Sequence, residues 1–284
     1  MQNPRLNDLS MANEAVENIE IELLVEGIFQ RYGFDFRHFA PTPFKRRLRY
    51  CMREQGVRSI SAFQEKILYD PQTWAQFLLV LSLNPKAIFG DPATYRVLRE
   101  AVLPSLAKQP VLRIWQAGCS SGEEVYSLAI LLREAGLTGR THIYATEMSA
   151  AVLARAKAGI YARDKMYEYG ENYHEAGGKQ SLADYYTLQG DRAVFREDLK
   201  QNITWAQHNL ASDSSFNAFH VILCRNVLMY FDRTLQTRAH ALFYDSLVID
   251  GCLGLGAQES VKFSLHARRY EEIDGANRWY RKLR

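Results

Sequence analysis

The sequence lacks the features that mark several classes of protein. The longest apolar run among its 284 residues, around Phe77–Leu83, is far shorter than the roughly 20 residues that cross a bilayer. The first residues, MQNPRLNDLS, lack the basic and then apolar order of a signal peptide. The four cysteines are widely scattered and form no Cys-x-x-Cys pair, so we expect reduced thiols, no metal site and a cytoplasmic location.

An excess of charge is also missing. The net charge of +3 is too small to indicate nucleic-acid binding by itself. With 47% hydrophobic and 24% charged residues, the composition is that of a soluble globular protein. We therefore expect neither a nucleic-acid partner nor insertion into a membrane, and a chain long enough for one large domain or two ordinary ones.

Helical spacing of apolar residues dominates the first third of the chain. Residues 1–18 are polar, which predicts a flexible tail, and residues 19–105 predict a helical N-terminal domain with a linker. Helices are expected over 21–33, 42–56, 59–70 and 71–83. Asn84-Pro85 and Asp91-Pro92 each join a capping residue to a proline, which predicts two further helix starts, the second opening a helix through Leu103.

Strand and helix patterns alternate over residues 106–284. The expected elements, in order, are a strand at 111–118, a helix at 122–135, a strand at 141–147, a helix at 149–159, strands at 202–210 and 219–231, a helix at 235–247 and a strand at 252–260. This alternation predicts an α/β domain with a parallel sheet. Two alternating runs around Gly190-Asp191 predict a small antiparallel β-subdomain at about 180–200.

The stretch IWQAGCSSGEEVYSLAI predicts a ligand site between a strand and a helix. Gly118 and Gly122 allow a ligand to approach the backbone, but neither G-x-G-x-x-G nor a Gly-Lys-Ser/Thr phosphate loop is present. Glu123 and Glu124 follow, and two acids would repel a pyrophosphate. They suit a ligand with an ammonium or sulfonium group, or they simply favour the positive end of the helix dipole.

Two further strand ends carry polar residues. Glu147 ends HIYATE, where an acid can accept the hydroxyls of an adenosine ribose, and Arg225-Asn226 end the buried run FHVILC. These residues could equally be a solvated acid, an ion pair and a helix cap, with Tyr230 a packed aromatic. A ligand with adenosine, a cation and a carboxylate would use all of them, and S-adenosylmethionine is such a ligand.

The blocks AGCSSGEEVYSLAI, YATEMSAAVLARAKAGIY, HNL and VILCRNVLMYFD resemble the chemotaxis receptor methyltransferases of the CheR family, from about Ile19 to the end of the chain. The resemblance implies a helical domain before a Rossmann-like methyltransferase domain with a small β-subdomain, and methyl transfer from S-adenosylmethionine to glutamates of chemoreceptor helices. It also implies site residues: Gly118 in the glycine turn, Glu124 at the methionine amino group, Glu147 at the ribose, Asn209 and Leu210 beside the adenine, Arg225 and Asn226 at the methionine moiety, Tyr230 near the acceptor, and Asn84 reaching back over the cofactor.

The linker departs from the family pattern. NPKAIFG replaces Asn-x-Thr-x-Phe-Phe-Arg, so Lys86 stands at the threonine position and Gly90 at the position of an arginine that normally helps to bind the cofactor. If the linker is helical, Lys86 and Gly90 share a face, and the Lys86 ammonium would reach the space of that arginine. An active protein-glutamate O-methyltransferase and a turnover-deficient module that binds cofactor or receptor both remain open.

The segment FKRRLRYCMR concentrates positive charge on one expected helix. Arg46, Arg49 and Arg53 lie on a common face, with Lys45 beside them. A solvated helix face is one interpretation. The family resemblance implies another, docking on the acidic methylation helices in the cytoplasmic part of a receptor.

Overall fold

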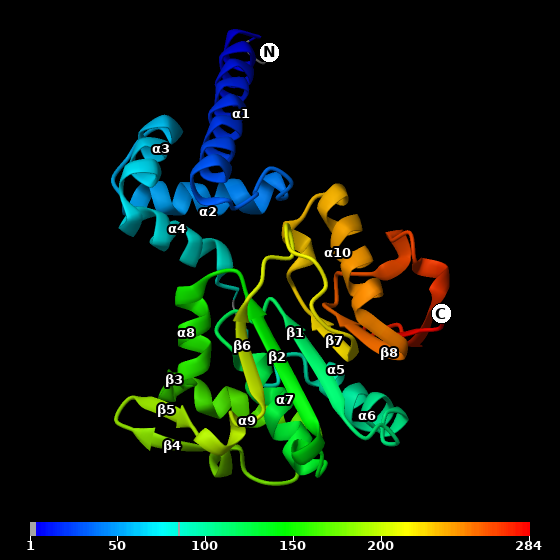
Figure 1. Cartoon of the computed structure of the whole chain (residues 1–284). Helices are drawn as coiled ribbons and strands as arrows, with labels where there is room; N and C mark the ends of the chain where they lie inside the picture. Colours follow the sequence, from blue (N-terminus) through cyan, green and yellow to red (C-terminus); the bar gives the residue numbers. More distant parts are fainter. Residues whose placement is uncertain (1–3, 85) are drawn as a thin grey trace. The chain divides into compact units, whose positions relative to one another are not determined.

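The computed structural model describes residues 4–84 and 86–284, which form two compact units that divide between Leu81 and Ser82 (Figure 1). The helix α1, Pro4–Tyr32, begins well inside the stretch for which the sequence predicts a tail. The predicted bounds of the tail and of the two domains stay predictions. Within the described residues, no helix combines the length and the hydropathy needed to cross a membrane.

The first unit is a helical bundle. After α1 come α2 (Pro41–Glu54), α3 (Ile60–Tyr69) and α4 (Pro71–Ser82), close to the helices that the sequence predicts. The α3 helix begins where the Ser59 side chain accepts a hydrogen bond from the backbone N–H of Ala62, as an N-cap does. Leu24, Phe63 and Phe77 are fully or almost fully buried in its core.

The linker is not the helix that Asn84-Pro85 suggests. Pro85 lies outside the described residues, and residues 86–90 have no regular structure. The backbone N–H of Gly90 donates to the Ala87 carbonyl, and Phe89 has a positive φ of 51°, so the chain turns here instead of propagating a helix. Lys86 and Gly90 therefore do not share a helical face. The second expected start is confirmed, because α5 (Pro92–Val97) begins at Pro92 and continues through a π-helical turn into α6 (Leu103–Ser105).

The second unit is built on a seven-stranded sheet with the order β6-β2-β1-β7-β8-β10-β9. Its strands are β1 (Leu112–Ala117), β2 (Thr141–Glu147), β6 (Ile203–Gln207), β7 (Phe219–Cys224), β8 (Leu247–Leu255), β9 (Tyr270–Asp274) and β10 (Trp279–Lys282). The first five in spatial order are parallel, whereas β10 pairs antiparallel with both neighbours. The predicted Rossmann-like α/β domain is thereby confirmed.

Helices α7 (Glu123–Glu134), α8 (Ala150–Ala158) and α10 (Arg233–Ser246) contact the sheet, α7 and α8 at β2 and α10 at β8 (Figure 1). A three-stranded antiparallel sheet joins β3 (Ile160–Ala162), β5 (Arg192–Phe195) and β4 (Tyr186–Gln189), and confirms the small β-subdomain. The helix α9, Met166–Glu175, was not predicted.

The strand order determines where a ligand can bind. The chain runs from β1 outward to β2 and β6 on one side, and later returns to place β7 and β8 on the other side of β1. The order thus reverses at β1, and in open parallel sheets ligands occupy the crevice beyond the strand ends at this reversal. The carboxyl ends of β1, β2 and β7 are therefore the place to look for the predicted site.

Candidate functional site

The turn after β1 depends on its glycines. Gly118 and Gly122 have φ values of 67° and 94°, a region that L side chains rarely adopt. A Cβ atom on Gly118 would lie 2.7 Å from a methyl group of Val227, and one on Gly122 would lie 2.9 Å from the Ala156 Cβ atom. The glycines therefore allow the turn to lie against both the β7 loop and α8, and they leave the Gly118 carbonyl exposed to the linker.

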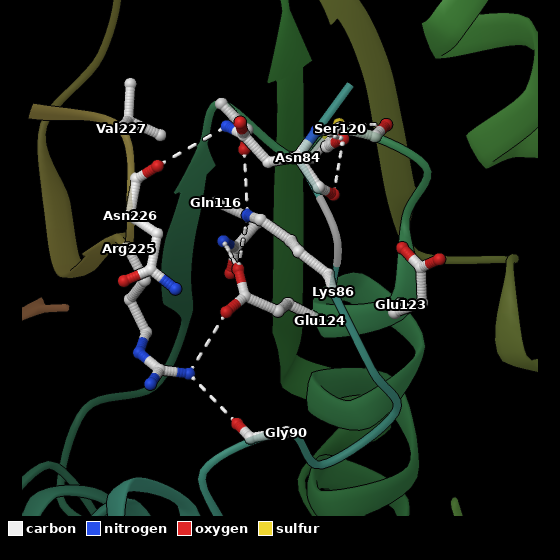
Figure 2. A network of polar contacts seen from close by, with 12 residues as sticks. Asn84, Lys86, Gly90, Gln116, Ser120, Glu123, Glu124, Arg225, Asn226 and Val227 are labelled. Atoms are coloured by element: carbon white, nitrogen blue, oxygen red, sulfur yellow. Dashed lines mark hydrogen bonds and ion pairs between the residues drawn. The ribbon is translucent and has the colours of Figure 1, made fainter. Parts of the chain in front are cut away.

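Glu124 is the centre of a buried polar network in the first turn of α7 (Figure 2). One carboxylate oxygen, Oε2, accepts hydrogen bonds from Lys86 Nζ at 2.6 Å and from Gln116 Nε2 at 2.8 Å. The other, Oε1, accepts from the Arg225 guanidinium at 3.0 Å. Burial would raise the pKa of Glu124, but the Lys86 ammonium and the Arg225 guanidinium outweigh it and hold that pKa below its ordinary value.

Arg225 joins this network to the linker. Its NH1 group also donates to the Gly90 carbonyl at 3.2 Å, and its NH2 group pairs with Asp91 at 2.6 Å. Burial acts to lower the pKa of Arg225, but nearby Glu124 acts the other way and the pKa lies above its usual value. The guanidinium therefore stays charged and holds the linker turn against the end of β7 (Figure 2).

Glu147 ends β2 with its carboxylate already hydrogen-bonded to the backbone. The Ser120 N–H donates to Oε2, and the N–H groups of Met148 and Ser149 donate to Oε1, at 3.1, 2.8 and 3.3 Å. A carboxylate offers about four acceptor positions, so these bonds leave about one for a ligand. Burial raises the pKa of this carboxyl group despite the backbone donors.

The loop after β7 carries Asn226 at a positive φ of 57°. A second buried acid, Glu259, accepts from the consecutive N–H groups of Asn226, Val227, Leu228 and Met229 and from Gly256. Asn84 donates its side-chain amide to the Asn226 carbonyl, and its own N–H donates to the Ser120 hydroxyl (Figure 2). Asn84 thus joins the glycine turn to the β7 loop, and its predicted role of reaching over the cofactor stays a prediction.

A cavity of about 450 Å³ lies beside this network. Its walls come from the linker, α7, α9 and the end of β7. The residues that line it are Lys86, Ala87, Gly90, Asp91, Glu124, Lys165, Glu168, Tyr169, Arg225 and Asn226. Of the predicted site residues, Lys86, Glu124, Arg225 and Asn226 therefore meet at one cavity.

Three further predicted residues follow the carboxyl ends of strands in the same sheet, but they are not among the described residues that line this cavity. Asn209 and the buried Leu210 follow β6, where the Asn209 side chain accepts from the Ala211 N–H. Tyr230 is half-buried in the turn Leu228–Tyr230. The roles that the resemblance gives to these three residues stay predictions.

Sequence reasoning did not identify four residues of the network, Asp91, Gln116, Ser120 and Glu259. Gln116 had a signal, since it is a polar residue next to the glycine turn in a strand whose only other polar residue is Arg113 near its start, and it is fully buried. Glu259 had none, because its contacts are with the backbone of another loop.

The basic segment on α2 borders a hollow of about 920 Å³ within the first unit. Lys45, Arg46, Arg49 and Arg53 line it, together with Glu14, Glu17, Pro41 and Thr42. Arg49 and Lys45 pair with Glu17 at 2.6 and 3.4 Å, and the hydrogen bond from Arg49 lowers the pKa of Glu17. Within the described part of the chain, Arg46 and Arg53 have no ion pair. These two arginines are therefore more available to an acidic partner than Lys45 and Arg49, which pair with Glu17.

Two family models match the chain, the "CheR methyltransferase, all-alpha domain" over residues 19–82 and the "CheR methyltransferase, SAM binding domain" over residues 84–276. A Pseudomonas putida protein that carries the name "Putative methyltransferase Cher3" is 44% identical over 96% of this chain and 100% of its own length. The chemotaxis protein methyltransferase of Listeria innocua is 30% identical over 81% of this chain and 85% of its own length. Chemotaxis protein methyltransferase 1 of Pseudomonas aeruginosa is 30% identical over 76% and 80%.

Among solved structures, the N-methyltransferase NodS of Bradyrhizobium japonicum in complex with S-adenosylhomocysteine is similar in fold. The TM-score is 0.42 at 14% identity, over 74% of this chain and 98% of that one.

Proposed function

The chain belongs to the CheR methyltransferase family, whose cofactor is S-adenosylmethionine, and from this premise we propose that it methylates glutamate side chains of chemoreceptors in the cytoplasm. The observation that carries the proposal is the buried network of Glu124 and Arg225, at the reversal of strand order and beside the 450 Å³ cavity. Turnover-deficient binding is the other candidate, because Gly90 stands where the family pattern has an arginine.

The residues fit the cofactor chemically. Gly118 and Gly122 form a turn that a Cβ atom would disturb, and Glu124 supplies a buried ionised carboxylate for an ammonium group. Arg225 and the amide of Asn226 suit a carboxylate, and Glu147 has about one acceptor position left for a ribose hydroxyl. Asn209 and Leu210 would flank the adenine. These assignments are proposals for each residue.

S-adenosylmethionine supplies an electrophilic methyl group on a sulfonium. A receptor glutamate is ionised near neutral pH, so its oxygen forms the bond to the methyl carbon while the carbon–sulfur bond breaks and its electron pair passes to sulfur. This transfer needs neither a strong base nor a metal. The protein's work is to align the two groups and exclude water, with Arg225 and Tyr230 nearest the reaction, and good alignment is worth ~7–11 kcal/mol.

The proposed partner surface is the basic face of α2, formed by Lys45, Arg46, Arg49 and Arg53. Receptor methylation helices are acidic by the family resemblance, so opposite charge would guide them to this face. The hollow that these residues border supports this role.

The test is transfer of a labelled methyl group from S-adenosylmethionine to receptor-rich membranes. We expect label that base releases as methanol, since a glutamate methyl ester is base-labile. Membranes without receptors are the control. Binding of the cofactor without any transfer to receptors would instead support the turnover-deficient module.

A further inference from the structure

Lys86 places its ammonium group deep inside the proposed cofactor site. Its Nζ atom donates to Glu124 Oε2 at 2.6 Å and to the Gly118 carbonyl at 3.0 Å (Figure 2). The side chain is only 2% exposed. Although burial acts to lower its pKa, Glu124 acts the other way, and the pKa of Lys86 lies above its ordinary value. This lysine is therefore a charged group held by two specific acceptors.

The same two acceptors are those that a ligand ammonium needs. Glu124 is the carboxylate proposed to meet the methionine amino group, and the Gly118 carbonyl belongs to the glycine turn where the cofactor approaches. Lys86 and Gln116 already use Oε2, and Arg225 uses Oε1. A carboxylate accepts about four hydrogen bonds, so about one position remains, on Oε1 beside the Arg225 guanidinium. A third cation beside Lys86 and Arg225 would also be repelled at this depth.

We propose that Lys86 competes with the cofactor's own ammonium group, so that its side chain has to leave Glu124 and Gly118 before the amino-acid end of the cofactor binds. The proposal rests on the cofactor site proposed above. It replaces the idea that Lys86 restores the arginine missing at Gly90, because the Gly90 carbonyl is contacted by Arg225 and the lysine points elsewhere.

The structure allows such a movement by the side chain alone. On one side of Lys86, the Asn84 N–H bonds to the Ser120 hydroxyl, and on the other the Phe89 N–H bonds to the Ser127 hydroxyl, so the linker backbone is held at both ends. Lysine has a flexible four-carbon stem. The 450 Å³ cavity that Lys86 lines provides room for it, and Glu168, which lines the same cavity from α9 and pairs with Lys165 at 3.6 Å, offers another carboxylate. Glu124 would keep Arg225 and Gln116 as partners.

Calorimetry with two ligands tests the proposal. S-adenosylhomocysteine carries the amino-acid end, whereas methylthioadenosine has the adenosine and sulfur without it. Lys86→Met removes the charge and keeps the stem. If Lys86 occupies the acceptors about nine-tenths of the time, Lys86→Met strengthens binding of S-adenosylhomocysteine about tenfold. Binding of methylthioadenosine stays unchanged. The exposed Lys108, changed to Met, is the matched control and alters neither affinity.

Amine labelling gives a second readout. An amine-reactive reagent followed by mass spectrometry should modify Lys86 slowly, because it is buried, and faster when S-adenosylhomocysteine is saturating. Lys108 should label equally in both conditions. Greater protection of Lys86 by the ligand would overturn the proposal, because it would mean that the lysine stays in place and contacts the ligand.

The remaining outcomes separate the two proposals. Equal or weaker binding of S-adenosylhomocysteine by Lys86→Met, while the natural chain binds both ligands, refutes the competition and leaves the cofactor site standing. An equal gain for methylthioadenosine also refutes it, because the effect would then not concern the ammonium. The natural chain and each variant are first shown to be folded by having the same melting temperature. If neither ligand then binds any of them, the proposed cofactor site itself is wrong.

Discussion

Glu259 organises the loop after β7 by accepting hydrogen bonds from its consecutive backbone N–H groups. Glu259→Gln should destabilise the second unit by roughly 3 kcal/mol, because the amide replaces one acceptor oxygen by donors that face buried N–H groups. Urea unfolding measures the loss. Glu171→Gln, on the exposed side of α9, is the control and should change little. Equal stability of the two variants would show that the loop holds itself without this carboxylate.

The proposed role of Glu147 is to bind the ribose of the cofactor, and two ligands can test it separately from binding of the amino-acid end. Glu147→Ala should weaken binding of S-adenosylhomocysteine by about 1.5–3 kcal/mol, the range for hydrogen bonds to a charged group. Methylthioadenosine should lose as much, because both ligands carry the ribose. Calorimetry with both ligands decides, and a loss confined to S-adenosylhomocysteine would contradict the assignment of Glu147 to the ribose.

At the scale of elements, the turn between β1 and α7 requires a left-handed residue in close contact with α8. Gly122→Ala should cost roughly 2 to 3 kcal/mol, because it adds the φ penalty of ~1 kcal/mol to a contact of 2.9 Å with Ala156. Gly136→Ala is the matched control, since Gly136 also has a positive φ but no atom within 4 Å of its Cβ position. Thermal unfolding compares them, and equal losses would exclude the close contact as a cause.

The α2 helix offers a test of receptor docking. Reversing both Arg46 and Arg53 to Glu should abolish receptor methylation and leave the affinity for S-adenosylhomocysteine unchanged, because these side chains belong to the other unit. Arg49 is left intact because it pairs with Glu17. Arg31 and Arg58, both exposed and changed together to Glu, are the control for net charge. Normal methylation by the double variant would remove this face from the proposal.

At the scale of the whole molecule, His240 makes stability depend on pH. Burial on α10 lowers its pKa from 6.5 to about 4. Below pH 6.5 His240 binds a proton in the unfolded chain but not in the folded chain. The free energy of unfolding therefore falls as pH decreases and stops falling near pH 4, where the folded chain is protonated too. The full loss amounts to about 3 kcal/mol. The pKa of His220 is lowered in the same direction, mainly by burial.

Urea unfolding of the natural chain and of His240→Gln at about pH 7 and pH 5 isolates the contribution of His240 as the difference between the two proteins, because His220 and the buried carboxyl groups contribute to both. The natural chain should lose more stability between the two pH values than His240→Gln does. The same pH dependence in both proteins would mean that His240 is protonated in the folded state.

The sequence by itself determined the local elements and their class. The alternation after residue 106 predicted the parallel strands, and the glycine turn before Glu123-Glu124 pointed to the candidate site, because periodicity and turn chemistry act over a few residues. The helix α9 was not predicted, although Met166, Tyr169 and Tyr173 follow one another at helical spacing in the sequence. The structure shows that these three side chains are buried. The strand expected at 252–260 lies at Leu247–Leu255, because Glu259 and Gly256 form a turn instead.

Only the tertiary structure decided which side chains meet. Lys86 reaches Glu124 from 38 positions away, and Arg225 reaches Asp91 from 134. These partners follow from the order of β2, β1 and β7 in the sheet and from the turn at Phe89. Neither feature produces a periodic pattern in the amino-acid sequence. A buried charge finds its partner through the packing of remote segments, so the sequence pointed to Glu124 and Lys86 separately as site residues, while the fold alone revealed that the two form a pair.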